Sequence, residues 1–252
     1  MSILAVENLE KSYSGFQAVK GVTFSLQAGE MLALIGPNGA GKSTCFNMIN
    51  GQLPPSAGRI RIFERDVTGM AAREIWRLGV GRTFQIAATF ASMTVAENVQ
   101  AALLSYHPHW AAGRWAARYY RGEANDLLAL VGMADQEQRS CGELAYGDVK
   151  RLELAVALAN DPKLLLMDEP TAGMAPNERA ALMTLLTRIA RERTIGVLFT
   201  EHDMDAVFGH ADRILVLNRG EIIAQGPPAR VRANPEVQAV YLGAGALFGA
   251  SH

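Results

Sequence analysis

The chain has 252 residues, of which 49% are hydrophobic, so it is long enough for one large domain or two small ones with a full apolar core. Its net charge is −1, so it lacks the basic excess typical of nucleic-acid-binding proteins. Its two cysteines suggest no disulfide framework. No apolar stretch approaches the ~18 residues that span a bilayer, and the N-terminus lacks the features of a signal peptide. We therefore expect a cytoplasmic protein that meets a membrane only through a partner.

The first third of the chain alternates strand patterns with helical ones. Apolar and polar residues alternate at 3–7 and 22–26, which predicts two strands of an antiparallel ribbon. The apolar run 31–35 predicts a buried strand. Further elements are expected as a strand at 59–63, a helix at 71–78 and a strand at 79–85 that ends on the amide of Gln85.

A glycine-rich turn follows the strand at 31–35 and leads into a helical pattern. Its sequence fits the phosphate-loop pattern G-x-x-x-x-G-K-[ST], in the strand–turn–helix context that this pattern requires. The residues are Gly36, Pro37, Asn38, Gly39, Ala40, Gly41, Lys42, Ser43 and Thr44. Glycines let consecutive backbone amides curl around a polyphosphate, Lys42 supplies charge for the β- and γ-phosphates, and Ser43 supplies a hydroxyl oxygen for Mg²⁺. The turn predicts that the chain binds a nucleoside triphosphate.

Aromatic residues stand at two further places of interest. Tyr13 precedes the phosphate loop on a turn, where its ring could stack on an adenine or could be an ordinary aromatic at a strand end. Arginines alternate with aromatic residues at 113–122, which suits either a docking surface or a helix that packs its rings inward.

Before that segment, Thr94 and Glu97 form a capping-box pattern at the start of a helix that runs to about Leu104.

The second half of the chain again alternates helices and strands. Helices are expected at 148–160, 178–192 and 235–242, buried strands at 163–167 and 195–199, and a hairpin at 213–217 and 221–224. This order predicts an α/β fold with a mostly parallel central sheet and an N-terminal antiparallel β-subdomain. The helix-rich segment of about 90–160 interrupts the alternation and is expected to form an inserted lobe, and 243–252 a frayed tail.

Acidic and polar residues end three of the predicted strands. Asp168 and Glu169 follow the strand at 163–167, at the edge where α/β folds bind ligands. Asp168 suits Mg²⁺ held through water, and Glu169 suits the polarisation of a water that attacks the γ-phosphate. His202 follows the next strand and is expected in the same crevice, and Gln85 can contact both Mg²⁺ and water.

A short segment near the start of the predicted helix at 148–160 indicates a specific protein family. Leu144, Ala145, Tyr146, Gly147 and Asp148 resemble the signature motif of ABC-type ATPases. Tyr13, 36–44, Gln85, 144–148, 164–169 and His202 then match, in order, the family's A-loop, Walker A, Q-loop, signature, Walker B and switch histidine. The resemblance implies a P-loop NTPase fold, with residues 1–242 as a single ABC ATPase domain built on a RecA-like core. It also implies that Tyr13 stacks on adenine.

The resemblance further implies that the protein works in pairs. In the family, the signature element completes the ATP site of a second ATPase subunit, so that two ATP molecules lie between two cassettes. Two departures concern this contact. Ala145 stands where the family usually has Ser, and Ala175 where it usually has Asp. Each removes a polar group, but Glu169 and His202 are both present, so we expect reduced or ordinary hydrolysis rather than none.

Several segments resemble the ATPases of branched-chain amino acid importers: 81–85, 93–98, the Leu-Ala-Tyr-Gly signature, and 234–243. Those systems contain two membrane permeases, two different ATPases and a periplasmic solute-binding protein, so this resemblance implies a cytoplasmic-face position bound to a permease. A groove beside Gln85 is expected to receive the permease's coupling helices. The alternatives are a soluble ABC ATPase outside transport and a nucleotide-gated scaffold with weak hydrolysis.

Overall fold

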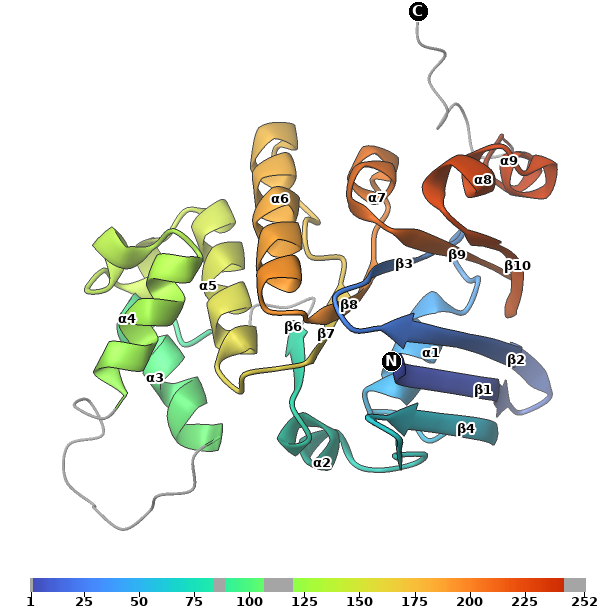
Figure 1. Cartoon of the computed structure of the whole chain (residues 1–252), viewed down its shortest axis with the longest axis horizontal. Coiled ribbons are helices and arrows are strands. Elements are labelled where there is room, and N and C mark those ends of the chain that lie inside the picture. Colours follow the sequence, from blue (N-terminus) through green and yellow to red (C-terminus); the bar gives the residue numbers. More distant parts are fainter. Residues whose placement is uncertain (1, 84–88, 107–119, 243–252) are drawn as a thin grey trace, which may run out of the picture.

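Two β-sheets form the framework of the computed structural model, which describes residues 2–83, 89–106 and 120–242 (Figure 1). One sheet has four strands in the order β2-β1-β4-β5, and the other has six in the order β10-β9-β3-β8-β7-β6. Gln85 and the arginine-rich stretch 113–119 lie outside the described residues, as does the tail 243–252.

The N-terminal sheet confirms the predicted antiparallel ribbon. Strands β1 (Ser2–Tyr13) and β2 (Phe16–Gln27) pair antiparallel, and β4 (Ala57–Ile62) pairs with the other edge of β1. The short β5 (Arg65–Asp66), which was not predicted, completes the sheet. Ser14 and Gly15 both have positive φ in the two-residue turn between β1 and β2, as the commonest tight hairpin turn requires. This turn places Tyr13 directly opposite Phe16.

The larger sheet is mostly parallel, as predicted. Its strands are β3 (Met31–Ile35), β6 (Val80–Thr83), β7 (Leu164–Asp168), β8 (Gly196–Thr200), β9 (Arg213–Asn218) and β10 (Glu221–Gly226). Strands β9, β3, β8, β7 and β6 run parallel, and only β10 returns antiparallel through the predicted hairpin. The carboxyl ends of β3, β7 and β8 therefore lie at one edge, where α/β sheets bind ligands.

The side chains of β3 show how this sheet joins two cores. Met31, Ala33 and Ile35 belong to a core shared with the helices of the second half of the chain. Leu32 and Leu34 belong to a second core, shared with α1 and the N-terminal sheet. Because successive side chains of a strand point to opposite faces, a strand covered on both sides must be apolar throughout. This is why the run at 31–35 has no polar residue.

The described helices are α1 (Lys42–Ile49), α2 (Ala72–Arg77), α3 (Val95–Tyr106), α4 (Arg121–Leu130), α5 (Tyr146–Leu158), α6 (Pro176–Glu192), α7 (Met204–His210), α8 (Pro228–Arg232) and α9 (Pro235–Leu242). The capping box that begins α3 is confirmed, because Thr94 N–H donates to Glu97 Oε2 at 2.8 Å and Glu97 N–H to Thr94 Oγ1 at 3.2 Å. Helices α3, α4 and α5 pack together beyond the β6 edge of the sheet (Figure 1). That 1–242 is a single domain with a lobe at about 90–160 stays a prediction.

The structure also corrects several sequence predictions. Helices α4, α7 and α8 had not been predicted, and α5 begins at Tyr146, two residues earlier than expected. The earlier start places Tyr146, Gly147 and Asp148 in the first turn of α5, with Ala145 at its N-cap. In the described parts of the chain, no helix is long and apolar enough to cross a bilayer.

Candidate nucleotide site

The phosphate loop runs from the end of β3 to the first residue of α1, in contact with neighbouring backbone. A side chain at Gly36, where φ is 155°, would place its Cβ 2.1 Å from the carbonyl oxygen of Leu217 on β9. A Cβ at Gly41, where φ is 102°, would lie 2.6 Å from the carbonyl oxygen of Ala18 on β2. Real Cβ atoms do not approach backbone oxygens this closely, so both positions require glycine. The glycine pattern of the motif thus also seats the loop between two strands.

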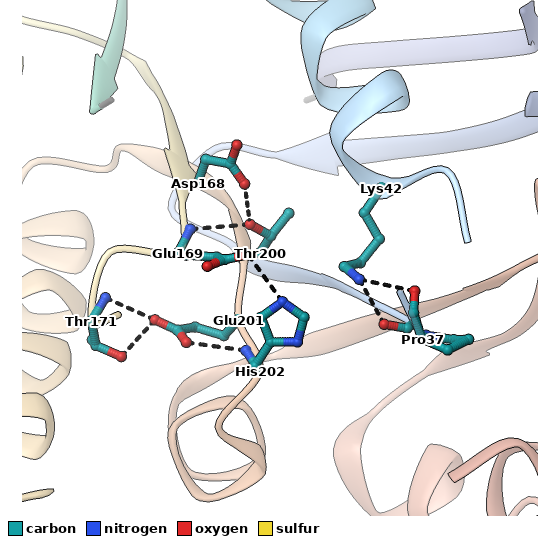
Figure 2. A network of polar contacts seen from close by, with 9 residues as sticks. Pro37, Lys42, Asp168, Glu169, Thr171, Thr200, Glu201 and His202 are labelled. Atoms are coloured by element: carbon teal, nitrogen blue, oxygen red, sulfur yellow. Dashed lines mark hydrogen bonds and ion pairs between the residues drawn. The ribbon is translucent and has the colours of Figure 1, made fainter. Parts of the chain in front are cut away.

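Lys42 folds back over this loop (Figure 2). Its ammonium donates to the carbonyl oxygens of Gly36 at 2.7 Å and Pro37 at 3.1 Å. Burial lowers the pKa of Lys42, and the nearby carboxylates of Glu169 and Asp168 partly oppose this shift. The hydrogen-bond partners of the ammonium are neutral carbonyls, and hydrogen bonds to an anion are stronger. An anion that enters the loop would therefore be a better partner for Lys42.

Thr200 at the end of β8 holds the two acidic residues that follow β7 (Figure 2). Its hydroxyl donates to Asp168 Oδ1 at 2.5 Å and accepts from the Glu169 N–H at 3.1 Å. The same N–H approaches the Thr200 carbonyl oxygen at 3.1 Å. Glu169 has φ 50°, a left-handed conformation that is unfavourable for a residue with a Cβ. These bonds fix the turn that redirects the chain after β7.

The carboxylate of Glu169 meets the ring of His202. Glu169 Oε1 lies 2.9 Å from His202 Nε2, and Figure 2 shows the two side chains on the side that faces Lys42. The Glu169 side chain is 23% exposed and that of His202 is 52% exposed. The pair is therefore open to solvent and to a ligand. Sequence reasoning had placed both residues in one crevice, and the geometry brings them into direct contact.

A cavity of about 320 Å³ joins these elements. Its lining consists of Tyr13, Phe16, Ala18, Asn38, Gly39, Ala40, Gly41, Lys42, Ser43, Thr44, Glu169 and His202. Asp168 is not in this lining, but Thr200 ties it to Glu169. The structure thus brings the phosphate loop together with Tyr13, Glu169 and His202.

Two aromatic rings stand at the mouth of this cavity. Tyr13 is 44% exposed and Phe16 is 65% exposed, and Lys11 Nζ lies 5.4 Å from the centre of the Tyr13 ring. Exposed rings beside a phosphate loop provide an apolar surface on which a base can stack. Sequence reasoning missed Phe16. The signal was its place directly after the Ser14–Gly15 turn, which pairs it with Tyr13.

A second polar group supports the site from behind and was also missed. The carboxylate of Glu201, which is 4% exposed, accepts from Thr171 N–H at 2.9 Å, Thr171 Oγ1 at 2.6 Å and His202 N–H at 3.2 Å. Figure 2 shows these bonds side by side with the Thr200 group. A buried carboxylate with three donors is well satisfied. Glu201 therefore links the loop after β7 to the loop that carries His202.

Comparison with known proteins explains this arrangement. The sequence profile of the ABC transporter family matches residues 19–172, and the profile of the branched-chain amino acid ATP-binding cassette transporter matches residues 221–246. This chain belongs to the ABC transporter ATP-binding proteins. It is an ABC ATPase, and its activity is the hydrolysis of ATP.

Relatives of this ABC ATPase resemble it over nearly its whole length. It is 38% identical to the high-affinity branched-chain amino acid transport ATP-binding protein LivG of Salmonella typhimurium, over 96% of this chain and 98% of LivG. It is 39% identical to the phosphonates import ATP-binding protein PhnC 2 of Haloarcula marismortui, over 90% of this chain and 85% of that protein.

Solved structures agree with this assignment. The ADP conformation of the ATP-binding cassette MJ1267 has a TM-score of 0.85 and 31% identity, over 96% of this chain and 99% of that one. The dimeric cassette MJ0796 bound to ADP and Pi has a TM-score of 0.76 and 25% identity, over 89% of this chain and 98% of that one. Both structures are ATP-binding cassettes, which agrees with the fold of this ABC ATPase.

The signature segment of this ABC ATPase lies apart from its nucleotide cavity. Among the described residues, none of Leu144–Asp148 lines that cavity. Ala145 is the N-cap of α5 and makes no side-chain cap hydrogen bond, and its carbonyl accepts from Asp148 N–H at 3.0 Å. A single chain thus brings together the phosphate loop, Tyr13, Glu169 and His202 around one cavity, and its signature segment lies outside that cavity.

Proposed function

We propose that this ABC ATPase powers the import of branched-chain amino acids or related small amino-acid-like solutes. The observation that carries the proposal is the match of residues 221–246 to the branched-chain amino acid cassette profile. Overall identity does not discriminate the solute, since it is 38% to LivG and 39% to a phosphonate importer's ATPase. Our proposal of the solute class therefore rests on the family match of the segment that includes β10 and α9.

In this proposal ATP occupies the cavity of about 320 Å³, with its phosphates in the loop 36–44. The adenine stacks on Tyr13, whose ring is half exposed at the cavity mouth. The loop amides and the N-terminal end of α1 face the phosphates, where a helix favours negative charge. Lys42 exchanges its carbonyl partners for oxygens of the β- and γ-phosphates.

The residues near the loop fit a Mg²⁺ ion. Ser43 would bind it directly, Asp168 through water, and Gln85, which lies outside the described residues, would be a further ligand. Hydroxyl and carboxylate oxygens suit Mg²⁺, which is usually bound by one or two protein groups together with water and phosphates. In the described part of the chain, no group of three His, Cys, Asp or Glu residues could hold a metal by itself. When bound, the ion neutralises charge on the β- and γ-phosphates.

Hydrolysis is assigned to Glu169 and His202. Glu169 polarises a water in line with the γ-phosphate and takes up its proton as the O–P bond forms and the bond to ADP breaks. His202 Nε2, at 2.9 Å from Glu169 Oε1, holds the carboxylate in position when that nitrogen carries the proton. ATP and water yield ADP and phosphate. Gln85 is expected to orient the same water.

The proposal requires a second cassette. Because Leu144–Asp148 lie outside the cavity, this segment is available to face ATP bound by a partner ATPase, with Gly147 and the first amides of α5 toward the phosphate. The partner is a second copy or a different ABC ATPase. Nucleic acid has no place in this scheme, in keeping with the net charge of −1.

A groove on another side of the molecule suits the permease. A cavity of about 350 Å³ lies between α2, β6, α3 and α5 and is lined by residues that include Arg73, Trp76, Arg82 and Val156. The lining combines apolar residues with two arginines, as a groove for an amphipathic helix would. The sequence predicts a permease groove beside Gln85, which lies outside the described residues, and we propose this cavity as that groove because Arg82 precedes Gln85 by three residues. The chain would sit on the cytoplasmic face of the membrane, and a periplasmic binding protein would act only through the permease.

The alternative is a nucleotide-gated scaffold with weak hydrolysis, favoured by Ala145 and Ala175, neither of which makes a side-chain cap hydrogen bond. Reconstitution with the cognate permease in proteoliposomes separates the two. We expect leucine-loaded binding protein to stimulate ATP hydrolysis severalfold and drive leucine uptake, with neither effect in Glu169→Gln. ATP binding without stimulated hydrolysis would favour the scaffold. Stimulation by phosphonate but not by leucine would contradict the solute class.

A further inference from the structure

Tyr146 in the signature segment contacts the loop that follows Glu169. Tyr146 is the first residue of α5, and its hydroxyl donates to the carbonyl oxygen of Ala172 at 2.9 Å. The side chain is nevertheless exposed on one side, since 49% of the residue remains accessible. A tyrosine that satisfies its hydroxyl within its own chain presents an ordered ring to a partner. We call residues 171–175 the linking loop.

The ring of Tyr146 has two close neighbours, Gly173 and Lys150. A Cβ on Gly173, where φ is 79°, would lie 3.4 Å from Tyr146 Cε1 and 3.5 Å from its hydroxyl oxygen, so the loop backbone lies against the ring. Lys150 Nζ also lies 5.5 Å from the ring centre. Lys150 is fixed in turn by Glu153 at 3.0 Å, with both side chains 5% exposed. The position of the hydroxyl is therefore well determined.

A second contact joins the same two segments. The carboxylate of Glu178 on α6 accepts from Ala175 N–H at 3.3 Å, at the end of the linking loop. Its Oε1 would lie 3.1 Å from a Cβ at Gly147, so the carboxylate packs against the signature backbone. The signature segment and the linking loop thus meet at both ends of the loop.

The linking loop begins two residues after Glu169 and is hydrogen-bonded both to Glu169 and to the neighbour of His202. The N–H of Ala172 donates to the carbonyl oxygen of Glu169 at 3.1 Å, which closes a tight turn. Thr171 is bound by the buried carboxylate of Glu201, the neighbour of His202. The carbonyl group that Tyr146 holds belongs to the same residue whose N–H closes this turn. A shift of Tyr146 therefore acts on the backbone that orients Glu169.

We propose that Tyr146 is a positioning residue that couples the signature segment to the Glu169–His202 pair of the same chain through the linking loop. The inference rests on the proposed function, because it concerns how engagement of the signature by a partner's ATP affects hydrolysis at the chain's own site. It assigns the Tyr146 hydroxyl a role in a chain whose Ala145 and Ala175 side chains offer no polar atom at the two N-caps beside it.

Tyr146→Phe tests the proposal, because it removes only the hydroxyl and keeps the ring against Gly173 and Lys150. We expect the kcat of ATP hydrolysis to fall roughly two- to tenfold, the range of a lost neutral hydrogen bond, with KM unchanged. Amide hydrogen exchange in a peptide spanning 168–176 should accelerate by a similar factor. Tyr106→Phe is the matched control, since Tyr106 packs edge to face on Trp76 of α2, and it should change neither quantity.

The outcomes separate this inference from the proposed function. A wild-type protein that hydrolyses ATP, with Tyr146→Phe matching it in kcat and in exchange, would overturn the coupling alone. A lower kcat with unchanged exchange at 168–176 would also overturn it, because the hydroxyl would then act on the partner. Absence of hydrolysis in the wild type would contradict the proposed function, and the exchange measurement would still decide whether Tyr146 orders the loop.

Discussion

Glu169 is a single residue that its neighbours hold in an unfavourable backbone conformation. Its φ of 50° costs on the order of 1–3 kcal/mol for a residue with a Cβ. The conformation persists because the Thr200 hydroxyl and carbonyl both lie within 3.1 Å of its N–H. The same hydroxyl fixes Asp168, so one threonine orders both acidic residues.

Removing this hydroxyl should therefore cost more than removing an exposed one. Thr200→Val removes the hydroxyl that donates to the Asp168 carboxylate, and we expect the free energy of unfolding to fall by about 1–3 kcal/mol and kcat to fall with it. Urea denaturation and phosphate release measure the two effects. Thr23→Val is the matched control, because the Thr23 hydroxyl accepts from Asn8 N–H on the exposed hairpin. An equal loss of stability in both variants would show that Thr200 has no special role.

The assignment of Glu169 as the base makes a separate prediction. Glu169→Gln keeps the shape of the side chain and the hydrogen bond to His202, so ATP binding should survive while kcat falls at least ~100-fold. ATP should then accumulate in a stable pair of cassettes, visible by size-exclusion chromatography as a species of twice the monomer mass. Glu221→Gln, a surface residue paired with Lys20, is the control and should hydrolyse normally. Continued hydrolysis by Glu169→Gln would refute the assignment.

Among individual site residues, sequence alone identified those that belong to a motif. The phosphate loop, Glu169 and His202 were predicted to share a site, and the structure places them around one cavity. Thr200 and Glu201 were not assigned any role. A hydroxyl or carboxylate at the end of a strand has no pattern of its own, and its importance arises only when a neighbouring strand brings Asp168 or Thr171 into reach.

At the scale of elements, burial determined which ones could be predicted. Strands β3, β7 and β8 lie inside the sheet, so their runs of apolar residues gave bounds within one residue of those found. Helix α7 was missed because it has only seven residues. Its signal was a cap: Asp203 Oδ1 accepts from Ala206 N–H at 2.8 Å. Helix α4 follows Tyr120, which has φ 59° and makes no side-chain cap, so no start signal existed.

The contact between α7 and α6 carries a prediction about pH. His210 at the end of α7 lies with Nδ1 3.4 Å from Thr187 Oγ1 on α6, and burial lowers the pKa of His210 below its usual 6.5. The unfolded chain therefore takes up a proton at a higher pH than the folded one, so stability is lost as the pH falls from 6.5 toward the folded pKa. Urea midpoints at pH 7.5 and 5.5 should differ more for the wild type than for His210→Gln. Equal differences would contradict the burial of this ring.

At the scale of the whole molecule, the signature segment lies apart from the cavity that the phosphate loop lines. The cavity holds the phosphate loop, Tyr13, Glu169 and His202, while the first turn of α5 lies outside it. The similar cassette MJ0796 is dimeric in a structure bound to ADP and Pi, which supports our proposal that a second chain supplies the signature element. The sequence could indicate this need through its signature motif. It could not indicate the partner, because the pairing surface is formed by two chains and one sequence describes only one side of it.

The central claim is that hydrolysis requires two cassettes and Glu169. The most direct test is the rate of phosphate release per molecule, measured across a wide range of protein concentration for the wild type and for Glu169→Gln. We expect the wild-type rate per molecule to rise with concentration until pairing saturates, and the variant to be inactive throughout. A rate per molecule that does not depend on concentration and that persists in Glu169→Gln would contradict it.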